Sequence, residues 1–183
     1  MKTCPWLLIA FVVLGAASRL IDHPWNFTPV LAIALFGGAC FRSGFQGLGV
    51  TLGILALSDV MLSFRTDYPL IYPDLPFNYG AFALAVALGT LLRNRRRVLP
   101  IVGVSMSASL VFFLVSNFGV WLVGGLYPRT WTGLLECYAL GVPFYKFTFA
   151  GDVVYSFLLF GLFALAERVV GSREAARIAN LPA

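Results

Sequence analysis

The hydrophobic residues of this chain form six long apolar runs, separated by short segments that hold most of its charged residues and prolines. One α-helix needs about 20 apolar residues to cross the hydrocarbon core of a bilayer, which is about 30 Å thick. We therefore predict an all-α polytopic membrane protein, a single domain built as a bundle of six transmembrane helices. The predicted spans cover residues 6–20, 28–41, 45–64, 77–92, 100–123 and 147–166.

Turn-forming residues set several of these boundaries. Thr28 is predicted to be a helix N-cap, with Pro29 in the first helical turn. The second span is short, and we expect neighbouring helices to shield it from lipid. In the long connection before the sixth span, residues 132–140 are expected to form a separate short helix, which Gly141 and Pro143 end.

The composition points to lipid as the surrounding solvent. Hydrophobic residues make up 60% of the 183 positions and charged residues only 11%, whereas a soluble domain has about 25% charged residues. The first run resembles a signal peptide, because Lys2 precedes it and small residues occupy positions 15–18. Arg19 follows those small residues directly, and we expect a retained first helix.

Lysine and arginine residues are unequally divided between the two sides of the predicted bundle. With the N-terminus inside, nine of the thirteen basic residues lie in inner segments and four in outer segments. The positive-inside rule then predicts a multi-pass protein of a bacterial inner membrane with both termini in the cytoplasm. Topology thus accounts for the net charge of +5, and no nucleic-acid partner is expected. The arginines of segment Arg93–Arg97 are the predicted anchor; binding of anionic lipid is the alternative.

The strongest polar residues all lie in the predicted outer halves of the spans, and the inner halves are nearly pure aliphatic and aromatic. Ionisable groups inside a membrane are energetically costly and are candidates for function. This asymmetry predicts a cup that opens outward and binds a small solute, such as a vitamin or cofactor precursor. The candidate substrate-binding residues are Asp59, Asn117 and Asp152, supported by Arg19, Asn26, Asn78, Tyr79 and Trp131.

The same residues also have structural interpretations. Asp59 and Arg19 could form an ion pair, and Asn117 could join helices by hydrogen bonding. Asp152 could simply be hydrated near the interface, and Asn26 could cap a helix. The alternative function is therefore a structural or assembly subunit that binds another membrane protein and no solute.

Small residues and cysteines add little chemistry. Ala34 and Gly38 indicate close helix contact, either within the chain or with another subunit. The three cysteines have neither disulfide nor metal-ligand spacing, and no nucleotide-binding, zinc-protease or serine-hydrolase motif occurs. We expect no metal, no cofactor and no catalytic residue; an enzyme that uses Cys137 is the remaining alternative.

Four short motifs carry a family resemblance: Asn-Phe-Thr-Pro at 26–29, Ser-Asp at 58–59, Ser-Asn-Phe-Gly-Val-Trp at 116–121 and Gly-Asp at 151–152. Over residues 19–167 the chain resembles a bacterial family of uncharacterised membrane proteins to which a transport role is assigned. In size, six spans and an outward polar half it also resembles the S components, the substrate-binding subunits of energy-coupling-factor (ECF) vitamin transporters.

This resemblance implies a six-helix protein that captures a vitamin-like solute from the outer face. It also implies an ECF-type coupling subunit with ATPases as the partner. S components carry an Ala-x-x-x-Ala face on the first helix, whereas here Leu14 stands four positions after Ala10. That departure leaves room for a solitary carrier, as among related corrinoid carriers.

Overall fold

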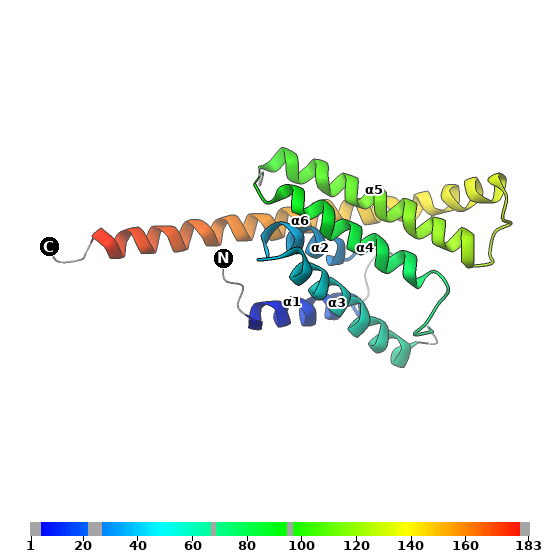
Figure 1. Ribbon diagram of the computed structural model, residues 1–183, viewed down its shortest axis with the longest axis horizontal. Helices are drawn as coiled ribbons and strands as arrows, with labels where there is room; N and C mark the ends of the chain where they lie inside the picture. The colour runs from blue at the N-terminus through cyan, green and yellow to red at the C-terminus, as the bar shows by residue number, and fades with distance from the viewer. Residues whose placement is uncertain (1–4, 22–26, 67–68, 95–96, 180–183) are drawn as a thin grey trace.

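A computed structural model describes residues 5–21, 27–66, 69–94 and 97–179 of the chain (Figure 1). These ranges contain helices and no strand, so the all-α prediction is confirmed. With η1 counted as part of α4, every predicted span boundary lies within two residues of a helix end, except both ends of the sixth. The helices are α1 (Pro5–Ser18), α2 (Val30–Cys40), α3 (Gly44–Arg65), α4 (Leu75–Gly89) with the 3-10 turn η1 (Thr90–Leu92), α5 (Val98–Val123) and α6 (Trp131–Ala179).

The last helix differs most from the prediction. The separate short helix and the sixth span form one continuous α6 of 49 residues, with Pro143 inside it. Gly141 and Pro143 therefore do not end a helix. One proline removes a single backbone hydrogen bond, and packing on α5 holds the segments on both sides in line. The ring of Phe113 lies 5.7 Å from that of Tyr138 and 5.0 Å from that of Tyr145.

The start of α2 also differs. Pro29, not Thr28, occupies the N-cap position, and no side chain caps the helix. Pro29 already has helical angles, φ −77° and ψ −1°, and its carbonyl oxygen accepts the first helical hydrogen bond, from the amide of Ile33 at 2.8 Å. The helix thus begins one residue later than a Thr28 cap requires.

Helix α2 is the centre of the molecule. All eleven of its residues are buried, and it contacts α1, α3, α4, α5 and α6. Its sequence is apolar on every side, which is typical of a helix buried on every side. The expectation that neighbours shield this short helix is confirmed. Its aromatic residue Phe36 contacts the rings of Phe11 and Phe160 at 5.6 and 5.4 Å between centroids.

Two glycines allow α2 and α4 to touch backbone to backbone. A Cβ atom built on Gly38 would lie 2.1 Å from the carbonyl oxygen of Val86, and one built on Gly89 would lie 2.2 Å from that of Leu35. Any side chain at either position would force the helices apart. The small-residue contact at Gly38 is therefore made within the chain.

Within the residues that the structure describes, four helical segments are long and apolar enough to cross a membrane, and two further apolar helices are shorter. Large apolar side chains are exposed on the outer faces of the bundle, for example Leu14, Met61, Leu110 and Leu158. A soluble monomer seldom exposes so extensive an apolar surface. The helices are compatible with a membrane-embedded protein. The four long segments are Gly44–Arg65, Leu75–Leu92, Val98–Val123 and Trp131–Val169.

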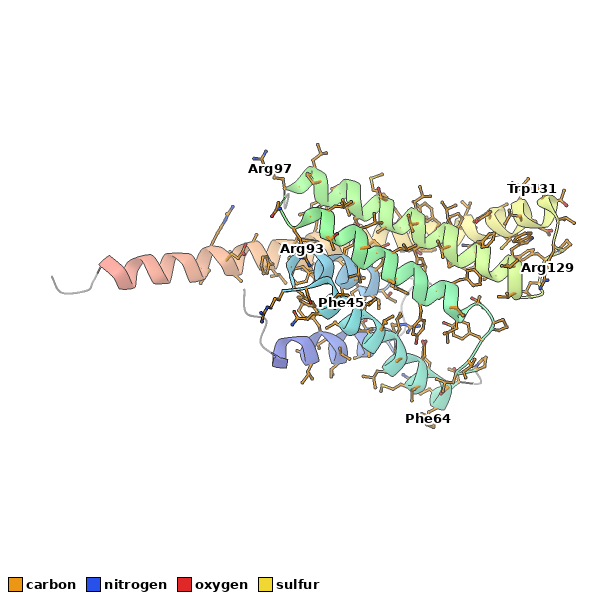
Figure 2. All side chains as sticks on the ribbon, in the orientation of Figure 1. Phe45, Phe64, Arg93, Arg97, Arg129 and Trp131 are labelled. Carbon is orange, nitrogen blue, oxygen red and sulfur yellow. The ribbon has the colours of Figure 1, made fainter. Side chains whose placement is uncertain are left out.

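The two ends of the bundle carry different residues. Arg93 and Arg97 lie at one end, and Arg129 and Trp131 lie at the other (Figure 2). The C-terminal part of α6 projects beyond the other helices on the Arg93 side (Figures 1 and 2). Arg93 also has a structural contact, because its Nε donates a hydrogen bond of 3.0 Å to the carbonyl oxygen of Gly38 near the end of α2. A cation there complements the helix dipole.

Candidate functional site

A cavity of about 300 Å³ lies where α1 and α3 end and α2 and α4 begin, with α5 and α6 completing its wall. Its size is at the lower end of the range for small-molecule sites, about 300 to 1,000 Å³. Apolar walls combined with a few convergent polar groups are also typical of such sites. The polar lining residues are Arg19, Thr28, Tyr72, Asn78, Tyr79, Thr148 and Asp152, and the apolar ones are Leu31, Leu55, Leu62, Phe82 and Phe112.

Among the described residues of the cavity wall, Asp152 is the one acidic residue. It lies on α6 and is 1% exposed. Its Oδ2 accepts a hydrogen bond from the hydroxyl of Ser109 on α5. Within the described part of the chain, no ion pair joins Asp152 to a cation. Burying a carboxylate without a counter-charge costs free energy, so this residue is the leading candidate for contact with a ligand.

Three serines continue the polar surface from Asp152 into the contact between α5 and α6. Ser109 Oγ lies 3.1 Å from the carbonyl oxygen of Ser105, and the hydroxyls of Ser105 and Ser156 are 3.3 Å apart. All three serines are 0 to 1% exposed. Ser105 and Ser109 belong to the inner half of the predicted fifth span, so the prediction that inner halves are nearly pure aliphatic and aromatic is wrong here.

Arg19 and Asp59 form the ion pair that the sequence allows. Arg19 Nη1 lies 2.8 Å from Asp59 Oδ1 and also donates to the hydroxyl of Ser58. The hydroxyl of Tyr79 donates to Asp59 Oδ2 at 3.0 Å. Asp59 is 2% exposed and does not line the cavity, whereas Arg19 and Tyr79 do. Asp59 therefore acts as a positioning residue that holds two residues of the cavity wall.

A second cavity of about 210 Å³ adjoins the first. The two cavities share Asn78, Phe112 and Thr148 in their walls. Asn117 lines only the second cavity, and its Nδ2 donates to the carbonyl oxygen of Phe113 in its own helix at 2.9 Å. The structure thus brings Asn78, but not Asn117, into the cavity that contains Asp152.

Besides Asp59, two further predicted site residues are not placed at either cavity. Trp131 is 80% exposed at the end of the bundle opposite Arg93 (Figure 2), and it lines neither cavity. The long connection predicted before the sixth span, from Leu126 to Tyr145, is mostly part of α6 and is therefore not a loop. Asn26 lies outside the described residues.

Thr148 is 6% exposed and lines both cavities, but it is not among the predicted site residues. A spacing signal was available, because Thr148, Asp152 and Ser156 stand four positions apart on one face of α6. Ser105 and Ser109 have the same spacing on α5. Two helices that carry matched polar pairs four residues apart are expected to meet along those pairs.

Cys137 is buried, at 2% exposure, and its Sγ lies 3.4 Å from the carbonyl oxygen of Asn117. It lines neither cavity. Among the described residues, no group of three or more His, Cys, Asp or Glu side chains could hold a metal ion. The polar chemistry of the site thus rests on Asp152, the Arg19 pair and neutral hydrogen-bonding groups.

Comparison with known proteins gives a family. No curated protein and no solved structure matches the chain. The sequence profile of a family of unknown function, DUF6580, matches residues 1–176, and this range includes every residue that lines the two cavities. The chain therefore belongs to the DUF6580 family.

Proposed function

We propose that this chain is a membrane protein of the S-component type, which binds a small solute in the Asp152 cavity and mediates its uptake from the outer face. One observation carries the proposal. Asp152 is almost completely buried, lines a cavity of small-molecule size, and has no described cationic partner. A solute that supplies the missing partner would offset the cost of burying this carboxylate.

The proposal places all six helices in the bilayer. Helices α1 and α2 are shorter than a helix that crosses lipid alone, but α2 is enclosed by its neighbours and needs no lipid contact. Both termini then face the cytoplasm of a bacterial inner membrane. The positive-inside count supports this orientation, because it puts Arg93 and Arg97 inside and the cavity in the outer half.

Uptake requires that the solute be released inward. In the S-component form of the proposal, an ECF-type coupling subunit with its ATPases supplies the energy. In the alternative form the chain works as a solitary carrier. Uptake of the solute by cells that lack any coupling subunit would support the solitary form, and uptake that depends on a coupling subunit would support the other.

The test begins with finding the solute. The chain is purified in lipid nanodiscs, and small molecules released on denaturation are identified by mass spectrometry. Each candidate, together with a general metabolite library, is then tested for its effect on thermal unfolding of the wild-type chain and of Asp152→Asn. We expect at least one solute to raise the unfolding temperature of the wild-type chain only.

A matched control makes this test specific. Glu136→Gln is the same acid-to-amide change on the same helix, at an exposed position outside both cavities. It should leave the solute effect intact. If no solute stabilises the wild-type chain, and Asp152→Asn changes only its stability, the solute-binding proposal is wrong and the structural-subunit alternative is favoured.

A further inference from the structure

The charges of the cavity wall leave one carboxylate without a counter-charge. Arg19 is already paired with Asp59 at 2.8 Å, so these two residues together contribute no net charge. Asp152 has no such partner among the described residues. Lys146 does not supply one, because its Nζ lies over the ring of Phe147 at 5.0 Å and it lines neither cavity. In its ionised form, Asp152 would therefore give the described wall one negative charge without a counter-charge.

The hydrogen bonds of the wall also favour a ligand that carries positive charge or donates hydrogen bonds. Asn78 Nδ2 donates to Asp74 Oδ2 at 3.0 Å, and the Thr148 hydroxyl donates to the carbonyl oxygen of Phe144 at 3.3 Å. The hydroxyl of Tyr79 donates its hydrogen bond to Asp59. Tyr79 and Thr148 have used their single hydroxyl donors on the protein, and Asn78 has used one of the two N–H donors of its amide. The side-chain oxygen atoms of all three residues are left as acceptors. A ligand that donates hydrogen bonds suits them best.

Arg19 keeps more donors than these residues, because its Nε and Nη2 donate to no described residue. An anionic group could approach these nitrogens. It would, however, lie close to the Asp59 carboxylate, which already takes up the charge of Arg19. The attraction for a second anion is therefore weak, and the unpaired charge of Asp152 decides the preference.

Aromatic rings line both cavities. Phe112 belongs to both walls, Phe82 to the first, and Phe113 and Tyr145 to the second. The faces of such rings carry negative electrostatic potential and attract cations, and their flat surfaces pack well against another ring. The adjoining cavity of about 210 Å³ gives space for an apolar ring beside the charged site.

We propose that the solute is a small organic cation. Its positively charged nitrogen, an ammonium group or a protonated heterocycle, lies at the Asp152 carboxylate, and its aromatic ring lies in the adjoining cavity against Phe112. This inference rests on the proposed function and names the chemical class of the solute at the same site. It selects against anionic solutes, which the unpaired carboxylate repels.

The test compares probes that share a ring and a two-carbon side chain and differ in the charged or neutral group at its end. Tryptamine, tryptophol and indole-3-acetate form one such set, and 2-phenylethylamine, 2-phenylethanol and phenylacetate form another. Binding to the purified chain in nanodiscs is measured by equilibrium dialysis. We expect the cation of at least one set to bind the wild-type chain at least tenfold more tightly than its neutral and anionic partners.

Two variants separate charge from folding. Asp152→Asn removes the charge, and it should weaken binding of the cation by about tenfold to a hundredfold, as for loss of a hydrogen bond to a charged group. Ser109→Ala keeps the charge and should preserve the order cation, neutral, anion. Both variants are first shown by thermal unfolding to be folded.

The possible failures are distinguishable. If neutral or anionic members bind as tightly as the cations, or if no cation binds, the charge assignment is overturned. The proposed function survives that result when a solute of another class still binds wild type and loses affinity in Asp152→Asn. If no solute of any class binds, both the assignment and the proposed function fail.

Discussion

Arg19, which follows α1, and Asp59, in α3, are joined by a contact of 2.8 Å between Nη1 and Oδ1. The second carboxylate oxygen of Asp59 accepts a hydrogen bond from the hydroxyl of Tyr79 in α4. Three helices that are separate in sequence thus meet at one buried carboxylate. The contact fixes the side of the cavity that α1 and α4 contribute, without exposing Asp59 to the ligand.

Removing one partner of this pair should destabilise the fold strongly. Asp59→Asn leaves the guanidinium of Arg19 without its counter-charge, and breaking a buried ion pair in this way costs about 3 to 5 kcal/mol. The side chain of Arg19 is still 22% exposed, so water can partly solvate the unpaired charge. We therefore expect a loss of stability in the lower part of this range. The free energy of unfolding in mixed detergent micelles measures the effect.

A double-mutant cycle supplies the control for this prediction. Arg19→Met combined with Asp59→Leu removes both charges, and it should cost less than the sum of Arg19→Met and Asp59→Leu alone. Strictly additive losses would show that the two residues do not interact in the folded protein.

The contact between Gly38 and α4 should tolerate no side chain. In Gly38→Ala the new methyl group would meet the carbonyl oxygen of Val86 at 2.1 Å, so α2 and α4 must separate and the core must loosen. We expect a loss of at least about 2 kcal/mol, as for overpacked cores. Gly49→Ala in α3 is the matched control, because a methyl group there meets nothing within 4 Å. Equal stability of the two variants in thermal unfolding would contradict the close packing of α2 and α4.

The proposed orientation predicts which end of the bundle is accessible from each side of the membrane. In a background without native cysteines, Arg97→Cys and Arg129→Cys are exposed positions at opposite ends of the bundle. A maleimide that cannot cross the membrane should label Arg129→Cys in intact cells, and it should label Arg97→Cys only after the cells are opened. The reverse pattern would place the cavity on the cytoplasmic side and would exclude uptake from outside.

The thiol of Cys137 should react slowly in the folded protein. It is 2% exposed and packs against the backbone of Asn117, so a bulky maleimide can reach it only after local opening. Labelling should become fast once the chain is unfolded. Rapid labelling of the folded protein that also abolishes an activity would instead favour the enzyme alternative.

Most of the fold could be predicted because the apolar runs are long and their ends carry strong polar signals. The prediction failed where a local signal was weaker than packing. Gly141 and Pro143 favour a helix end locally, but the contacts of Phe113 with Tyr138 and Tyr145 hold α6 together on both sides. Local propensity does not include contacts of this kind.

The candidate site could be predicted only in part. Polarity within a span was enough to single out Asp152, Arg19, Asn78 and Tyr79, which share one cavity. It could not show that Asp59 faces Arg19 and not the cavity, because that depends on how α3 is rotated. Polarity also could not place Trp131. The sequence predicted a connection between helices around this residue, whereas the structure shows that α6 begins there.

Binding of the solute at the Asp152 cavity is tested by comparing the affinity of the identified solute for wild type and for Asp152→Asn. Equilibrium dialysis in nanodiscs gives both dissociation constants, and Glu136→Gln reports any general effect of removing an acid from α6. We predict that Asp152→Asn binds at least tenfold more weakly and that Glu136→Gln binds like wild type. Equal affinity in all three proteins would mean that the solute does not bind at the Asp152 cavity.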